Sequence, residues 1–259
     1  MKGKRSLGQN FLTSPRTAES IVRAANIESV PTVLEVGPGH GMLTRALLLA
    51  GKKVIAVEKD DALFAELTET FAKEIGKGKL LLIHADVLDV EKNTVFKKHV
   101  RGEYAVVANI PYNITGKLIP FFLHLKPQPK SVTLMVQYEV AKRICDTKTE
   151  GESILSLSVK IFAQPAFLKK ISAGSFSPKP NVDSALLQLT PHAKSLLGKI
   201  KEEDFFDLVK KGFAHKRKVL KNNIGARDEE LRVCTIAPNA RAETLTSNDL
   251  LCLLSSNKK

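Results

Sequence analysis

The chain has 259 residues, enough for one large domain or a large domain with a small one attached. Its 40 lysines and arginines against 27 aspartates and glutamates give a formal net charge of +13, which favours a polyanionic partner such as nucleic acid or an anionic membrane surface. No apolar run approaches the roughly 18 residues of a membrane span, and the amino terminus lacks the apolar stretch of a secretion signal. We therefore expect a cytoplasmic protein without a membrane partner, and a merely soluble basic protein is the alternative reading of the charge.

Short apolar runs alternate with longer amphipathic stretches from residue 32 onward. Because each run is followed by helical periodicity, this order predicts an α/β fold with a mostly parallel sheet and helices on both faces. Two further runs are separated only by the proline-rich "GSFSPKPNVD", which is too short for a helical crossover, so we expect an antiparallel strand at the sheet edge. The predicted strands cover residues 32–36, 53–58, 79–86, 104–109, 131–137, 166–172 and 184–190.

Strand signals end near Pro191, and the remaining sequence is helical. In "EEDFFDLVKKGF" the residues Phe205, Phe206, Val209 and Phe213 form one apolar stripe, which predicts an amphipathic helix over 202–213. The chain thus divides into a predicted sheet domain at residues 1–190 and a small all-helical domain at residues 191–259.

The cysteines and histidines do not suggest a cross-link or a metal site. Cys145, Cys234 and Cys252 are odd in number and lack CxxC spacing, so we expect core thiols and no disulfide. The six histidines show none of the spacings that metal sites need, and we predict no bound metal.

A glycine-rich loop follows the first long strand. In "VLEVGPGHGMLT", Gly37, Gly39 and Gly41 let backbone amides approach a ligand where a side chain would collide. The pattern is typical of a nucleotide-type site, with a structural tight turn as the alternative. Because the spacing is GxGxG and not GxGxxG, it disfavours a nicotinamide-dependent oxidoreductase.

Two acidic residues end the next two strands at the same edge of the predicted sheet. Glu58 lies 21 residues after Gly37, where a carboxylate can accept hydrogen bonds from both hydroxyls of a ribose. Asp86 follows the third strand, where its oxygens can accept a bond from an adenine amino group. A helix cap is the alternative for Asp86.

The fourth strand ends in the motif "NIPY", residues Asn109 to Tyr112. Together with the glycine loop and the two acids, it resembles the motif order of Rossmann-like class I methyltransferases that use S-adenosylmethionine and methylate amines. This resemblance implies that a side-chain oxygen and a backbone carbonyl accept hydrogen bonds from an exocyclic amine while the ring of Tyr112 stacks on the base. Acceptors that hold the amine hydrogens out of the ring plane would make an adenine nitrogen a better nucleophile.

Further motifs narrow the resemblance to one family. The segments "LGQNFL", "EVGPGHGMLT", "VEKD", "NIPYNI", "QYEVAKRI", "SFSPKPNVDSAL", "FAHKRKVLKNNI" and "RAETLT" occur in the order seen in ribosomal RNA adenine dimethyltransferases. The wording "PNVDSA" and the "RAETLT" segment favour the bacterial small-subunit, kasugamycin-resistance type. The resemblance implies cofactor contacts at Asn10, Leu12, Gly37, Gly39, Glu58, Asp86 and Asn109. It implies catalytic positions at Asn109, Pro111, Tyr112 and Phe176, with Tyr112 and Phe176 sandwiching the target adenine. Core packing is the alternative for Leu12 and for Phe176.

The substrate implied by this resemblance is a pair of adjacent adenosines near the 3′ end of small-subunit ribosomal RNA, which would be dimethylated during ribosome biogenesis. We expect a monomer that acts on the small ribosomal subunit and not on DNA. A large-subunit enzyme of the macrolide-resistance type and a non-catalytic RNA-binding assembly factor are the alternatives.

A basic segment in the helical domain suggests where RNA phosphates would bind. Twelve positions without an acidic residue contain Lys210, Lys211, Lys216, Arg217, Lys218 and Lys221, and Lys2, Lys4 and Arg5 near the amino terminus would extend this surface. An ordinary solvated helix face is the alternative.

Overall fold

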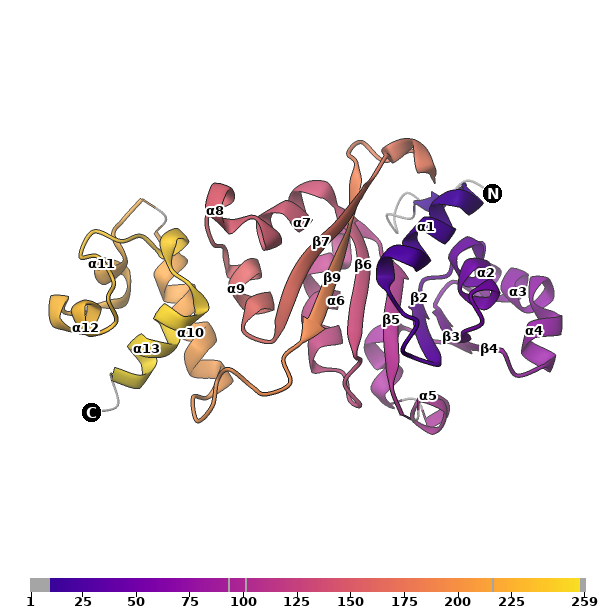
Figure 1. Ribbon diagram of the computed structural model, residues 1–259, viewed down its shortest axis with the longest axis horizontal. Helices are drawn as coiled ribbons and strands as arrows, with labels where there is room; N and C mark the ends of the chain where they lie inside the picture. The colour runs from indigo at the N-terminus through magenta and orange to yellow at the C-terminus, as the bar shows by residue number, and fades with distance from the viewer. Residues whose placement is uncertain (1–9, 93, 101, 216, 257–259) are drawn as a thin grey trace. The chain divides into compact units, whose positions relative to one another are not determined.

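The computed structural model describes residues 10–92, 94–100, 102–215 and 217–256 (Figure 1). Contacts between Cα atoms divide the chain into two compact units. The first comprises Met1–Ala141 and Ala166–Pro191, and the second comprises Lys142–Pro165 and His192–Lys259. The second unit therefore includes 24 residues that precede the boundary expected from the sequence.

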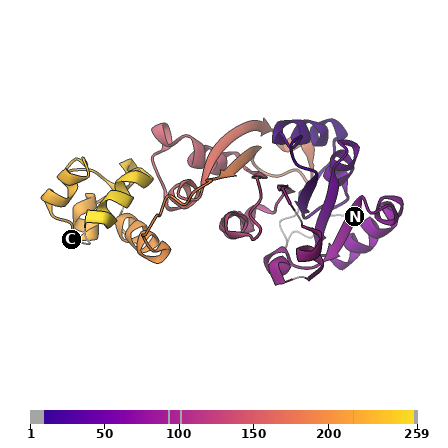
Figure 2. The same cartoon turned by 60° about the horizontal axis from the view of Figure 1, so that its bottom comes forward.

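The first unit is built on a seven-stranded sheet with the strand order β4-β3-β2-β5-β6-β9-β7 (Figures 1 and 2). In this order the five strands from β4 to β6 are parallel to one another, and β9 is antiparallel to β6. This arrangement confirms the predicted α/β fold with a mostly parallel sheet and an antiparallel edge. The strands are β2 (Thr32–Val36), β3 (Lys53–Glu58), β4 (Leu80–His84), β5 (Tyr104–Asn109), β6 (Ser131–Gln137), β7 (Ala163–Ile171) and β9 (Ser184–Pro191).

The helices of the first unit include the crossovers between parallel strands, because each crossover must return the chain to the same edge of the sheet. They are α1 (Pro15–Ala25), α2 (Met42–Leu49), α3 (Asp61–Thr70), α4 (Ala72–Gly76), α5 (Thr94–His99) and α6 (Thr115–His124), with 3₁₀ turns η2 (Val87–Lys92), η3 (Tyr112–Ile114) and η4 (Ala173–Ser175). Helix α7 (Tyr138–Cys145) begins in the first unit and ends in the second.

One hydrophobic core of the first unit lies between a face of the sheet and helices α1 and α2. Ala18, Ile21 and Ala25 recur every three to four residues along α1, which gives that helix a buried stripe. They join a single hydrophobic cluster with alternate strand residues such as Val33 and Val54. The cluster anchors the strands whose carboxyl ends carry the candidate site.

The second unit is helical around its own hydrophobic cluster. The predicted helix over 202–213 is confirmed as α10, and Phe205 and Val209 of its apolar stripe are buried. Leu157 and Ile161 join the same cluster, which is why residues 142–165 belong to this unit. Its helices are α8 (Thr147–Glu150), α9 (Ile154–Lys160), α10 (Glu202–Phe213), α11 (Leu220–Ile224), α12 (Asp228–Val233) and α13 (Ser247–Ser256), with the 3₁₀ turn η5 (Ala242–Thr244).

One prediction about the cysteines is wrong. Cys234 and Cys252 form a disulfide with their Cα atoms 5.7 Å apart, whereas Cys145 is free. Packing of α13 against α12 brings together these two cysteines, which are 18 positions apart in the sequence. Their local spacing does not predict such a contact. Among the described residues, no helix is long and apolar enough to cross a lipid bilayer.

The basic segment runs from the last turn of α10 to the first residues of α11 and is only partly described. Lys210, Lys211, Arg217 and Lys218 are exposed, whereas Lys221 donates to Asp228 at 2.9 Å. Lys216, together with Lys2, Lys4 and Arg5, lies outside the described residues.

Candidate active site

The glycine loop joins the end of β2 to the start of α2. Gly37 and Gly39 have φ values of +66° and +60°, in the left-handed region that side chains disfavour. A Cβ atom on Gly39 would lie 2.7 Å from Cδ1 of Phe11, so glycine is also required there by close packing. The loop thus lets the segment around Phe11 lie directly against its backbone.

Glu58 ends β3 and is held at the loop by backbone donors. Its Oε1 accepts hydrogen bonds from the N–H groups of Lys59 and Asp60 at 2.8 and 2.9 Å, and its Oε2 accepts from Gly39 at 3.4 Å. The side chain is 5% exposed, and this burial raises its pKa despite the three donors. The carboxyl group is therefore fixed in position, with acceptor capacity left for a ligand hydroxyl.

Asp86 lies just after β4 and is bound on both oxygens. Its Oδ2 accepts from Nζ of Lys59 at 2.8 Å, and its Oδ1 accepts from the N–H of Leu88 at 3.0 Å. The hydrogen bond from Lys59 lowers the pKa of Asp86, so this carboxyl is ionised at neutral pH. The bond to Leu88 is the capping interaction that the sequence offered as an alternative, and it leaves lone pairs for a further donor.

The segment from Asn109 to Tyr112 leaves the end of β5 and turns into η3. The Nδ2 group of Asn109 donates to the backbone carbonyl of Asn10 at 2.8 Å, so Oδ1 is the acceptor end of this amide. The hydroxyl of Tyr112 shares a hydrogen bond of 2.6 Å with the hydroxyl of Ser184 on β9, and burial raises its pKa. Both side chains are thereby anchored to segments distant in the sequence.

A two-stranded antiparallel sheet joins the amino-terminal motif to the proline-rich segment. Strand β1 (Phe11–Leu12) pairs with β8 (Phe176–Ser177), and Leu12 lies opposite Phe176. Leu12 and Phe176 are 7% and 4% exposed, and both belong to the hydrophobic cluster of the first unit. This pairing places the segment of Asn10 and Phe11 beside the glycine loop.

A cavity of about 530 Å³ lies at the carboxyl edge of the parallel strands. Glu58 and Asp86 contribute acidic groups to its lining, and Leu63, Val87 and Leu118 contribute apolar surface. Its volume is within the range of about 300–1,000 Å³ that is usual for small-molecule sites. The cavity is therefore large enough for a nucleoside-sized ligand.

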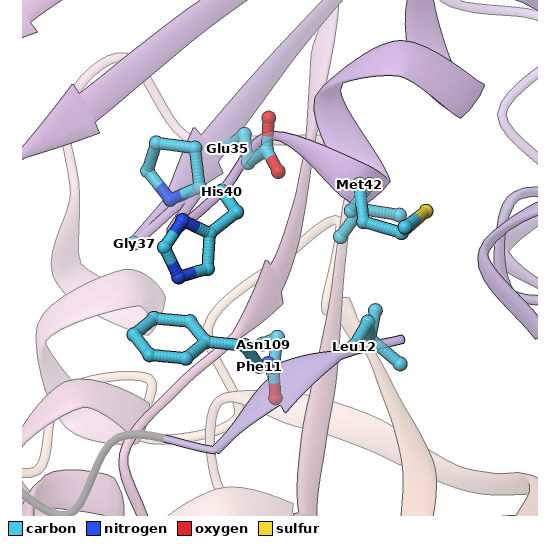
Figure 3. Close-up of a pocket in the computed structure, with 9 residues that line it drawn as sticks. Phe11, Leu12, Glu35, Gly37, His40, Met42 and Asn109 are labelled. Carbon is cyan, nitrogen blue, oxygen red and sulfur yellow. The ribbon is translucent and has the colours of Figure 1, made fainter. Parts of the chain in front are cut away.

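A second, smaller cavity of about 20 Å³ is lined by Gly37 and Pro38 of the glycine loop and by Glu35. Figure 3 shows Glu35 and His40 facing Phe11, Leu12 and Asn109 across it. Phe11, Gly37 and Asn109 line both cavities, so the two adjoin.

Comparisons with known proteins show the family of the chain. The family model described as ribosomal RNA adenine dimethylase matches residues 1–258. The chain belongs to the ribosomal RNA adenine dimethylase family. It is thus a methyltransferase that acts on adenine of ribosomal RNA, and its resemblance to this family in motif order is confirmed.

Individual relatives support the assignment over nearly the whole chain. A ribosomal RNA small subunit methyltransferase A from Dehalococcoides mccartyi is 38% identical, over 98% of this chain and 88% of the relative. One from Enterococcus faecalis is 35% identical, over 99% and 90%. The crystal structure of a dimethyladenosine transferase from Plasmodium falciparum has a TM-score of 0.75 at 27% identity, over 96% and 98%. That of the 23S rRNA methyltransferase ErmE has a TM-score of 0.74 at 24% identity, over 96% and 100%, and supports the fold alone.

The structure of this methyltransferase brings most of the predicted site residues to one cavity. The large cavity is lined by Asn10, Gly37, Gly39, Glu58, Asp86, Asn109 and Pro111. Leu12 lines the small cavity, whereas Tyr112 and Phe176 are not in the lining of either one. Their roles toward the cofactor and the base stay predictions.

Sequence reasoning missed two contributors to the site. Phe11 lines both cavities and packs on Gly39 and against the ring of His40 at a centroid distance of 4.5 Å. Glu35 lies two residues before Gly37 within an apolar run, and a charged residue in a buried strand was the available signal.

Proposed function

We propose that the chain transfers methyl groups from S-adenosylmethionine to the exocyclic amines of two adjacent adenosines near the 3′ end of small-subunit ribosomal RNA. The small-subunit methyltransferase names of the relatives support this substrate. The observation that carries the proposal is the presence of Glu58, Asp86, Asn109 and Pro111 in the lining of one cavity. A ribose acceptor, an adenine acceptor and the amine-binding motif then lie within reach of one nucleoside-sized ligand.

The residues present fit this cofactor. Gly37 has no Cβ, and its positive φ disfavours any residue with a side chain beside the carbonyl of Asn109. Glu58 would accept hydrogen bonds from the ribose hydroxyls, and Asp86 from the adenine amino group. Asn10 and Leu12 would complete the contacts. When bound, the cofactor supplies a methyl group on a positively charged sulfur, which is a good leaving group.

The motif residues would prepare the target amine. Oδ1 of Asn109 and the carbonyl of Ile110 would accept its two hydrogens, which weakens delocalisation of the nitrogen lone pair into the ring. Pro111 would fix the turn, since its φ of −58° is the value that the pyrrolidine ring imposes. The ring of Tyr112 would stack on the base, with Phe176 on the opposite side, and such stacking contributes on the order of 1–3 kcal/mol.

We further propose a division of labour between the two predicted domains. Residues 1–190 would bind the cofactor, and residues 191–259 would bind RNA through the exposed basic side chains between α10 and α11. The protein would act as a monomer on the small ribosomal subunit and not on DNA. RNA shape, more than sequence, would guide this contact.

A methylation assay tests the proposal directly. The protein is incubated with isotope-labelled S-adenosylmethionine and with unmethylated small subunits, large-subunit RNA or DNA, and the modified nucleosides are identified by mass spectrometry. We expect dimethyladenosine in small-subunit RNA alone. Product only in large-subunit RNA would assign the macrolide-resistance activity, and tight cofactor binding without product on any substrate would favour an assembly factor.

A further inference from the structure

Glu35 is a buried carboxyl that the methyl transfer described above does not use. It is the last residue but one of β2 and is 1% exposed. Its Oε2 accepts a hydrogen bond of 2.7 Å from the hydroxyl of Thr44 on α2. Its Oε1 is equally buried and has no hydrogen-bond partner within the described part of the chain. A buried polar atom of this kind is costly, so its retention calls for a reason.

The surroundings of Glu35 connect it to the candidate cofactor site. Glu35 lines the small cavity, whose volume of about 20 Å³ holds one water-sized group (Figure 3). Phe11, Gly37 and Asn109 line both this space and the large cavity. Because the two cavities share these residues, a positive charge bound in the large cavity would favour the carboxylate form of Glu35.

Among the described residues, the polar and titratable groups around Glu35 include no cation that pairs with its negative charge. Glu58 from β3 adds a like charge, and Thr44 from α2 donates from its hydroxyl and its backbone N–H. His40 from the glycine loop faces the same cavity, but its Nδ1 pairs with Glu66 at 2.8 Å. Burial raises the pKa of Glu35 to about 8, and the charge of Glu58 adds to that effect. These surroundings favour the neutral acid form of Glu35 in the ligand-free protein at neutral pH.

We propose that Glu35 is a proton-releasing part of the cofactor site, a carboxylic acid in the free protein that becomes a carboxylate when S-adenosylmethionine binds. The inference rests on the proposed function, which supplies the identity of the ligand. The cofactor brings a positive sulfur into the large cavity, and that charge stabilises the carboxylate. One O–H bond of Glu35 breaks, its electron pair stays on the oxygen, and the proton passes to the solvent buffer.

The exchange makes cofactor affinity depend on pH. At pH values where Glu35 is protonated in the free protein, part of the binding free energy is used to ionise it. The affinity for the cofactor therefore increases by up to about tenfold per pH unit as the pH rises toward the pKa of about 8. Above that value the carboxylate is already formed and affinity no longer changes. The carboxylate of Glu35 is opposite in charge to the sulfur of the cofactor. It therefore favours binding of the cofactor over binding of the uncharged thioether product.

Isothermal titration calorimetry with S-adenosylmethionine tests the proposal. Titrations near pH 7 in two buffers that differ in ionisation enthalpy, phosphate and Tris, give the number of protons released per cofactor bound. For the unaltered protein we expect at least about half a proton. Glu35→Gln, which keeps the shape but cannot ionise, should lose this release, and the difference between the two proteins removes any ionisation of the cofactor itself.

Two further variants keep the test decisive. His40→Gln should retain the release, because its imidazole is not the source of the proton. Thr44→Val removes the hydroxyl that donates to the carboxylate, and it should move the rise in affinity to higher pH. Binding without buffer dependence in the unaltered protein, or undiminished release in Glu35→Gln, would overturn the inference, whereas absence of any binding of S-adenosylmethionine would overturn the proposed function instead.

Discussion

Replacement of Glu35 by glutamine measures how much the buried carboxyl group lowers the free energy of unfolding. Burial raises its pKa from 4.5 to about 8, so the folded chain keeps a proton that the unfolded chain has released. The contribution of the protonated Glu35 side chain to the free energy of unfolding is therefore fully present below pH 4.5 and is lost as the pH rises toward 8. Between these pH values the free energy of unfolding falls by about 1.4 kcal/mol per pH unit, so the loss reaches roughly 3 kcal/mol near pH 7.

The assay is urea unfolding of the ligand-free protein, followed by circular dichroism across this pH range. Glu35→Gln keeps an acceptor for Thr44 and cannot ionise, so its advantage over the unaltered protein should be small near pH 4 and reach roughly 3 kcal/mol near pH 7. Glu69→Gln removes an exposed carboxyl of α3 and serves as the control for net charge. An advantage that does not change with pH would refute the reasoning.

Further predictions concern the site and the second core. Glu58→Ala should weaken S-adenosylmethionine binding by roughly 1.5–3 kcal/mol in calorimetry, since it removes a charged acceptor; unchanged affinity in the folded variant would remove Glu58 from the ribose role. Tyr112→Phe and Ser184→Ala each break the same hydrogen bond and should lower the methylation rate by similar factors, of about 2–10, with cofactor affinity unchanged. A nearly inactive Tyr112→Phe would show that the hydroxyl has a further role. Phe205→Ala should lower the free energy of unfolding by roughly 3–5 kcal/mol in urea, because its side chain is fully buried in the second unit; a loss below about 1 kcal/mol would contradict its place in that core.

Local pattern was sufficient for the sheet and for much of the site. The five parallel strands follow from apolar runs of five to seven residues separated by helical stretches, since that order leaves few other topologies. Glu58 and Asn109 end strands β3 and β5, and all parallel strands present their carboxyl ends at one edge. Their place at a shared cavity is thus a consequence of covalent order and strand direction.

Contacts between distant segments were beyond the reach of local pattern. The pairing of β1 with β8 joins Leu12 to Phe176, and a strand of two residues has no periodicity to reveal it. The disulfide between Cys234 and Cys252 depends in the same way on how α12 and α13 pack. These features arise from packing energy that is available only once the chain has collapsed.

The sequence by itself determined the order of strands and helices, the glycine loop and the acidic and amide groups at the strand ends, because each depends on neighbouring residues. Tertiary structure alone decided that Tyr112 is anchored by Ser184, 72 positions away, and that Asn109 is turned by the carbonyl of Asn10. It also decided the state of Glu35. A carboxyl in an apolar strand is charged or neutral according to the groups that surround it, and those groups come from β3, α2 and the glycine loop.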